Sequence, residues 1–214
     1  MTIRYTTDGS DPDSTSSPVY NGPVSVNGFA IIKAKAVRQG WYASPIVAFS
    51  FFKKGIKPSG AELINQPNEK YKGEGAITLS DLKKGTADNF GDVAWLGFRE
   101  KPFVAFFYFD TVQTISSISI SYNKNVQSYL MPPAGIEIWG GDDKSRLKLL
   151  KKLSPPQTTK EEKDVVRVEG IEIDLEPATY KYYKIIATNI GKLPPWHPGK
   201  GDKGWLFIDE IFFN

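Results

Sequence analysis

The residues best suited to bind a ligand lie in a loop rich in proline and glycine near the end of the chain, where Trp196 and His197 stand between prolines. A sugar site needs a flat apolar surface for one face of the ring and a few polar groups for the hydroxyls, and aromatic side chains supply the first. We predict that Trp196 and Tyr129 stack on a sugar, that His197 and Lys200 donate hydrogen bonds, and that Asn125 is an amide contact. The alternative is that Trp196 closes one end of the fold and that His197 bonds the backbone.

Two adjacent carboxylates near the C-terminus, Asp209 and Glu210, have the chemistry of a general acid–base pair. They lie in a strand pattern, however, and the two-residue period of a strand predicts that they point to opposite faces. The single histidine excludes a metal site built from several histidines, and no phosphate-binding loop or serine nucleophile motif occurs. The sequence therefore indicates that this chain is not itself an enzyme.

The elements that must position these residues are strands, because apolar and polar residues alternate along much of the chain. In segment 117–122 the apolar residues are expected to face a core and the serines to face outward. Similar alternation occurs in segments 32–36, 136–138, 171–175, 180–186 and 205–213. Half-buried strands separated by turn residues predict an all-β fold of antiparallel sheets packed as a sandwich.

Segment 145–153 fits two patterns, because its leucines recur at a spacing that a basic amphipathic helix would also show. A turn of two glycines and two aspartates precedes it and favours a hairpin, so we predict a strand. Trp95 and Trp205 lie in apolar, strand-like runs and are predicted to be core residues. Trp41 follows a glycine and is predicted to pack at a turn or between domains.

Composition limits the classes of protein to which the chain can belong. The 214 residues include no cysteine, which excludes disulfides and thiolate metal sites, and the net charge of +3 comes from mixed signs. Mixed charges argue against a nucleic-acid partner, and no apolar stretch is long enough for membrane insertion. A charged stretch with glycine and proline at 54–60 predicts a linker between a first domain, 1–53, and a second domain, 61–214.

Several motifs occur in a fixed order in the first domain, namely IRYTTDGSDP, SSPVYNGPV, IKAKA and SPIVAFSF. Together they resemble the C-terminal domain of chitobiases and β-hexosaminidases, which implies a partial immunoglobulin-like β-sandwich. Because a strand begins at Ile3 with nothing before it to pair with, we expect an N-terminally truncated domain in a piece of a longer protein. The resemblance implies a parent enzyme of glycoside hydrolase family 20, whose catalytic (β/α)8 barrel takes around 250 residues and does not fit in this chain.

The second domain carries its own set of motifs, which include DLKKGTADNFGDVAWLGF, SYLMPP, IEIW, YYKI, LPPWHPGKG and WLFIDEI. They resemble the discoidin family, also called coagulation factor 5/8 type C, of galactose-binding-like jelly-roll β-sandwiches. The combination is similar to the domain that follows the chitobiase-type domain in bacterial β-hexosaminidases, those of Bacteroidetes in particular. Two residues depart from the family pattern, since Leu82 and Thr111 stand where the family usually has glycine.

The two resemblances imply a non-catalytic accessory region of a chitobiase or β-N-acetylhexosaminidase that binds carbohydrate. The implied partners are a glycan of the N-acetylhexosamine or galactose type and the catalytic domain of the parent chain. The implied location of that parent is the periplasm, the outer membrane or the outside of the cell. Two alternatives stay open: both domains only pack on the catalytic barrel, or they belong to another glycosidase.

The discoidin resemblance also implies a structural calcium ion between an early loop and the last strand. Calcium takes six to eight oxygen ligands from carboxylates and carbonyls. The corresponding positions in this sequence are Asp81, Thr86, Asp88, Asp92 and Glu210. The alternative is that these are ordinary turn residues and a carboxylate near the end of a strand.

Overall fold

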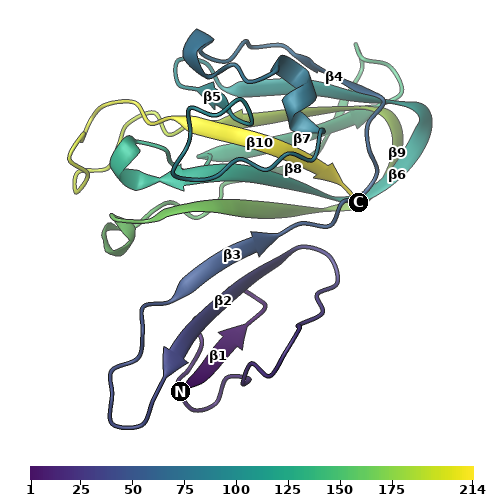
Figure 1. Cartoon of the computed structure of the whole chain (residues 1–214). Helices are drawn as coiled ribbons and strands as arrows, with labels where there is room; N and C mark the ends of the chain where they lie inside the picture. Colours follow the sequence, from purple (N-terminus) through teal and green to yellow (C-terminus); the bar gives the residue numbers. More distant parts are fainter. The chain divides into compact units, whose positions relative to one another are not determined.

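The structure is a computed structural model that describes residues 1–214, and the chain forms two compact units, residues 1–53 and residues 54–214. Figure 1 shows that the regular elements are strands, joined by loops and short 3-10 turns. Strands within each sheet pair antiparallel. The all-β prediction is therefore confirmed. None of the helical turns has the length and apolar character that crossing a bilayer requires.

The first unit is a three-stranded sheet in the order β1 (Thr2–Thr6), β2 (Ala30–Val37) and β3 (Val47–Phe51). The turn that follows β1 is closed by a carboxylate, because Asp8 Oδ1 accepts hydrogen bonds from the backbone N–H of Ser10 at 3.0 Å and from its hydroxyl at 2.6 Å. This is the local bonding that favours aspartate and serine in turns.

The second unit contains seven strands and four 3-10 turns. The strands are β4 (Gly60–Leu63), β5 (Leu96–Phe98), β6 (Phe103–Asn125), β7 (Gly135–Gly141), β8 (Lys148–Leu153), β9 (Val166–Thr188) and β10 (Leu206–Phe213). The turns are η1 (Glu69–Tyr71), η2 (Gly75–Leu79), η3 (Val126–Ser128) and η4 (Lys160–Glu162). The ambiguous segment 145–153 forms β8 and pairs with β7, so the strand prediction is confirmed.

Two long strands, β6 and β9, belong to both sheets of the second unit. The first half of β6 pairs with β4 and with the second half of β9, whereas its second half pairs with β10 and with the first half of β9. Shifts in register after Tyr108 and after Ile115 mark the crossing from one sheet to the other. The unit is therefore a jelly-roll β-sandwich, and Figure 1 shows both long strands curving round at one end of it.

The apolar residues of segment 117–122 are buried in the main core, as the alternation predicts; they are Ile118, Ile120 and Tyr122. Ser119 and Ser121 lie on the other face of the sheet, yet they are buried as well. Segment 80–88 covers that face, and Lys84 Nζ donates a hydrogen bond to Ser121 Oγ. Alternation thus identified the two faces but not the segment that covers the outer one.

The predicted linker 54–60 is attached to the second unit rather than free. The backbone N–H of Ile56 donates to the carbonyl of Phe213 at 2.7 Å, and that of Ser59 donates to the carbonyl of Tyr108 at 2.9 Å. Gly60, the last residue of the predicted linker, already begins β4. The stretch is therefore an edge of the sandwich, and its glycine and proline content reflects its turns.

Five loops gather at the end of the sandwich away from residues 54 and 214, because the antiparallel pairing turns the chain back there. They comprise residues 64–68, 99–102, 126–134, 154–165 and 189–205. We call this region the loop end. In Figure 1 the yellow loop before β10 and the turquoise turn after β6 project from it together.

Candidate functional site

The predicted ligand-binding side chains all lie at the loop end. Trp196, His197 and Lys200 belong to loop 189–205, whereas Asn125 and Tyr129 flank η3 at the end of β6. The ring centroids of Tyr129 and His197 are 5.0 Å apart, and those of Trp196 and His197 are 5.8 Å apart. The structure thus brings these three rings together.

His197 supports the loop and is not available to a ligand. Its side chain is 2% exposed, its Nε2 lies 2.7 Å from the carbonyl oxygen of Val126, and its Nδ1 accepts the backbone N–H of Gly199 at 2.9 Å. Because Nδ1 accepts, Nε2 carries the proton and donates it to Val126. Both ring nitrogens are therefore occupied, which corrects the prediction that His197 donates to a sugar.

Asn125 is likewise a structural residue. Its Oδ1 accepts the backbone N–H of Ser128 at 3.2 Å, and its Nδ2 donates to the carbonyl of Ala87 at 3.4 Å, so the buried amide closes η3. This replaces the predicted ligand contact. Lys200, by contrast, is exposed and forms no ion pair, so its ammonium is free to meet a ligand.

Tyr129 and Trp196 are half-buried and pack against a small apolar cluster of Val126, Met131 and Leu193. Gly199 lies so close to the Tyr129 ring that a Cβ there would collide with it. The rings therefore hold loop 189–205 in place, and only part of each ring is left for a ligand.

A pocket of about 260 Å³ opens at the same end, and the sequence did not indicate it. Three loops line it with Gln66, Pro67, Asn68, Phe98, Arg99, Glu100, Lys101 and Trp205.

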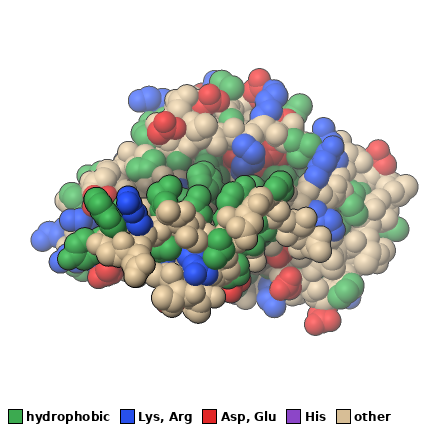
Figure 2. Space-filling model, turned by 60° about the horizontal axis from the view of Figure 1, so that its bottom comes forward, with side chains coloured by type: hydrophobic (Ala, Val, Ile, Leu, Met, Phe, Trp, Pro, Cys, Tyr) green, Lys and Arg blue, Asp and Glu red, His purple; other side chains and the backbone are tan.

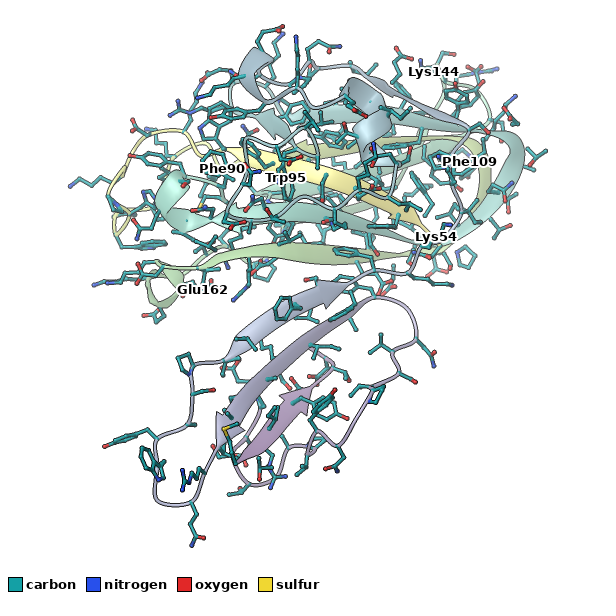
Figure 3. The ribbon with its side chains drawn as sticks, in the orientation of Figure 1. Lys54, Phe90, Trp95, Phe109, Lys144 and Glu162 are labelled. Atoms are coloured by element: carbon teal, nitrogen blue, oxygen red, sulfur yellow. The ribbon has the colours of Figure 1, made fainter.

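Trp205 is only half-buried, and the centroid of its ring lies 5.3 Å from that of the Tyr71 ring. Trp205 packs against the apolar cluster of Trp95, Leu130 and Phe207, so the prediction of a core residue holds for its contacts but not for complete burial. Trp95 is fully buried, as predicted, and lies with Phe90 beside β10 (Figure 3).

Arg99 is held in place beside the pocket without being neutralised. Its guanidinium carbon lies 5.4 Å from the centroid of the Trp205 ring, and its Nε donates to the carbonyl of Lys203 at 3.2 Å. Asn189 Nδ2 also binds the Arg99 carbonyl at 2.6 Å, which fixes the turn. The two terminal nitrogens of Arg99 donate to no protein atom, and no carboxylate pairs with them.

The other charges of the pocket leave it positive. Glu100 pairs with Lys203, and this hydrogen bond lowers the pKa of the exposed Glu100 carboxyl. Lys101 is exposed and forms no ion pair. Elsewhere, Figure 2 shows acidic and basic side chains scattered over one face of the molecule rather than gathered by sign.

A single pairing assembles this pocket from residues that are far apart in the sequence. Leu206 of β10 pairs with Phe98 of β5, which sets Trp205 beside Arg99. The charged turn formed by Arg99, Glu100 and Lys101 was visible as a loop between two apolar runs. Trp205, which lies beside this turn but 106 residues later in the chain, could not be placed there from the sequence. Pairing between distant strands leaves no local signal.

The structure does not gather the five predicted calcium ligands. Asp92 Oδ1 accepts the backbone N–H of Ala94 at 2.9 Å within its own turn, and the carbonyl of Thr86 accepts Trp95 Nε1 at 3.2 Å. Asp88 is exposed and makes no hydrogen bond through its side chain. Only the remaining two, Asp81 and Glu210, lie within hydrogen-bonding reach of each other. No group of three or more acidic or histidine side chains is arranged to hold a metal ion.

Asp209 and Glu210 both lie beneath segment 80–88, which corrects the prediction that they point to opposite faces. The register of β10 against β6 shifts between Ile208 and Glu210, and the extra residue of such a bulge interrupts the alternation. Asp209 Oδ2 lies 2.7 Å from Lys84 Nζ and accepts the backbone N–H of Gly85 at 3.1 Å. Lys84 thus supplies a positive charge inside this acidic cluster.

Glu210 is 0% exposed, and neither of its oxygens has a hydrogen-bond donor. Burial raises the pKa of Glu210 to about 8, and the neighbouring carboxyls of Asp81 and Asp209 act in the same direction. The orphaned oxygens by themselves suit a cation. Calcium requires six to eight oxygens, however, and the ammonium of Lys84 already neutralises Asp209. The residues present therefore do not fit the calcium site that the sequence resemblance implies.

Comparisons with known proteins match a family model to the first unit only. Residues 1–51 match the family described as Fn3 associated, and no curated protein matches the chain. Among solved structures, a CBM32 of AlyQ in complex with 4,5-unsaturated mannuronic acid is 11% identical, with 74% of this chain and 95% of that chain covered and a TM-score of 0.45.

Two further structures are similar to the same degree. A pectin-binding carbohydrate-binding module is 16% identical, covers 74% of this chain and 91% of its own, and has a TM-score of 0.46. The C-terminal domain of a chitobiase from Bacteroides fragilis is 14% identical, covers 74% of this chain and 95% of its own, and also has a TM-score of 0.46. Likeness at this level does not tell what the present chain binds.

Proposed function

We propose that the second unit is a non-catalytic accessory domain that binds carbohydrate in the pocket at the loop end. The observation that carries this proposal is the half-buried Trp205 ring in a pocket whose lining also offers amide and charged side chains. An indole ring packs against the C–H face of a pyranose, and side-chain amides and charged groups pair with its hydroxyls.

The size and the lining of the pocket suit one sugar ring. Its volume of about 260 Å³ lies just below the range of about 300–1,000 Å³ that is typical of sites for drug-sized ligands. Gln66 and Asn68 are exposed at its rim. Gln66 Nε2 donates to the carbonyl of Leu63 at 3.3 Å and Asn68 Oδ1 accepts the backbone N–H of Lys70 at 3.0 Å, so Gln66 Oε1 and Asn68 Nδ2 are the atoms left for ring hydroxyls. We expect affinities between millimolar and micromolar, about 4–8 kcal/mol, because one shallow site buries little surface.

A more specific proposal concerns the enzyme to which this chain belongs. Two sets of motifs, those of residues 3–52 and those of the second unit, together support an accessory region of a family 20 glycoside hydrolase. The proposed partners are a glycan of the N-acetylhexosamine or galactose type and the catalytic domain of that enzyme. A parent that acts on glycans in the periplasm, at the outer membrane or outside the cell is part of this proposal. The sequence upstream of residue 1 tests it directly, because a (β/α)8 barrel there is the expected finding.

A titration followed by two-dimensional NMR tests the binding proposal. The full chain is titrated with N-acetylglucosamine, N-acetylgalactosamine, galactose and uronic acids, and shifts are expected for the indole N–H of Trp205 and for the Arg99–Lys101 turn. Trp205→Ala is expected to abolish them. Trp41→Ala is the matched control, because Trp41 is 71% exposed, with the guanidinium of Arg38 at 5.3 Å from its ring centroid, and belongs to the first unit. The absence of any shift with every sugar would refute binding in this pocket.

One observation favours the alternative that the first unit serves in packing. Val47, Phe49 and Phe51 of β3 are exposed, so one face of this strand presents apolar side chains. Faces of this kind are typical of surfaces that meet another protein. If the first unit packs on the catalytic domain, charged substitutions at Phe49 should weaken that association without changing sugar binding by the second unit.

A further inference from the structure

We infer that the sugar bound in the pocket at the loop end is an acidic one, and that Arg99 receives its carboxylate. The inference rests on the proposed function, since it names the class of sugar for the same pocket, and for this pocket it replaces the neutral N-acetylhexosamine or galactose type with an acidic sugar. Its basis is a guanidinium that the protein holds in position but does not neutralise, in a pocket with a net positive charge.

Arg99 is fixed by contacts that leave its binding edge open. Stacking on the Trp205 ring and donation from Nε to the Lys203 carbonyl together restrict the orientation of the guanidinium plane. The two terminal nitrogens remain available, and they form the planar fork that matches the two oxygens of a carboxylate. A long side chain that is already ordered loses little further entropy when it binds a ligand.

The charges around Arg99 favour an anion over a neutral sugar. The only carboxylate in the lining is Glu100, and Lys203 neutralises it from outside the pocket. Lys101 adds a second unpaired positive charge to the lining. A neutral ligand would leave both cations without a counter-charge, whereas a carboxylate on the ring would supply one.

Arg99 and Trp205 also restrict where the carboxylate must sit on the ligand. The guanidinium lies over the indole at 5.4 Å from its ring centre and covers part of it, so a sugar ring that contacts the exposed remainder of Trp205 has to carry its acidic group on the side that faces Arg99. A uronic acid, in which a pyranose carries a carboxylate on its ring, meets this requirement. A free small anion meets only the charge requirement and has nothing to place on the indole.

The test compares the affinity of the full chain for three kinds of ligand by isothermal titration calorimetry and NMR. Galacturonic, glucuronic and mannuronic acids carry the ring and the charge, their methyl esters carry the ring alone, and acetate carries the charge alone. At least one uronic acid is expected to bind about tenfold or more tightly than its methyl ester, because charged hydrogen bonds to the fork are lost in the ester. Acetate is expected to bind more weakly than that acid.

Variants of Arg99 sharpen the result. Arg99→Gln is expected to bring the ratio of acid to ester affinity close to one, and Arg99→Lys to leave an intermediate ratio, because it keeps the charge but loses the fork. Arg38→Gln is the matched control, since the Arg38 guanidinium lies over Trp41 at 5.3 Å in the first unit. Its acid-to-ester ratio should equal that of the unaltered chain. The NMR spectra of all variants should show that the fold is intact.

The outcomes separate this inference from the proposed function. Equal binding of acids and esters, or tighter binding of neutral hexoses, at Trp205 would overturn the acidic specificity and leave carbohydrate binding standing. Acetate binding as tightly as the uronic acids would also overturn it, since the pocket would then be a plain anion site. No binding of any sugar would overturn both proposals together.

Discussion

Lys84 and Arg99 are two cations of the same unit with opposite surroundings. The ammonium of Lys84 lies 2.7 Å from Asp209, which is 0% exposed, and next to the buried Glu210. Burial lowers the pKa of Lys84, while Asp209 acts in the opposite direction. Arg99, at the loop end, lies over an aromatic ring and forms no ion pair with a carboxylate; it acts on Glu100 only through its field.

The difference shows how to tell a structural charge from a binding charge. A cation whose partners are buried carboxylates stabilises the fold, because removing it leaves those carboxylates without a counter-charge. A cation that is ordered by other contacts and left without a counter-charge retains its capacity to bind an anion. Residue type alone does not separate the two cases, since both side chains are basic residues in loops.

The largest expected effect is the loss of Lys84, the cation paired with the buried Asp209. Lys84→Met should lower the free energy of unfolding by about 3–4 kcal/mol, because Asp209 then stays buried without its partner. Urea unfolding of the full chain measures this. Arg99→Gln is the matched variant and should change stability by about 0.5 kcal/mol or less, as is typical of surface substitutions. Equal effects of the two substitutions would remove the distinction between the cations.

The next effect in size is a dependence of stability on pH that arises from Glu210. Its pKa in the folded state is raised from 4.5 to about 8, so the folded chain holds this proton where the unfolded chain has released it. Stability from this group is complete below the unfolded pKa and is lost as the pH rises through the folded pKa. We expect a loss on the order of 3 kcal/mol between about pH 5 and pH 7.5.

Glu210→Gln provides the control for the pH prediction. Glutamine has a similar shape and no ionisable proton, so the fall in unfolding free energy over this pH range should become shallower. Denaturant titrations of both proteins across the range give the two slopes. If the slopes are the same, Glu210 is already ionised in the folded chain at neutral pH.

The smallest expected effect is that of calcium. Because Lys84 supplies the charge beside Asp209 and three of the predicted ligands lie elsewhere, the thermal midpoint of the chain should be the same in excess calcium and in excess chelator. Differential scanning calorimetry in the two buffers tests this. A clear rise in the midpoint with calcium would restore the calcium prediction, since an ion that binds only the folded state stabilises it by mass action.

Alternation of apolar and polar residues gave the strands correctly, including Ile118 and Ile120 in the core and β8 in the ambiguous segment. These predictions succeed because the side-chain period of a strand is a local property of the backbone. The same rule failed at Asp209 and Glu210, because a bulge of one residue reverses the facing of everything beyond it and carries no local signal.

The sequence and the structure indicate candidate sites at the same end of the sandwich but with different residues. The aromatic loop around Trp196, where proline and glycine interrupt the strand pattern, lies at the same end as the pocket beside Trp205. Of the predicted contacts there, His197 and Asn125 turned out to be bonded to backbone groups. Hydrogen-bonding partners depend on which loop lies beside a residue, and sequence spacing does not contain that information.

By itself the sequence determined the all-β class, because the local two-residue periodicity of strands decides it. Only the tertiary structure decided which groups can meet a ligand. Pairing of β10 with β5 placed Trp205 beside Arg99, and segment 80–88 set Lys84 against the buried carboxylate of Asp209. Both results depend on contacts between residues more than 100 positions apart, and such contacts follow from how the strands pair rather than from any local pattern.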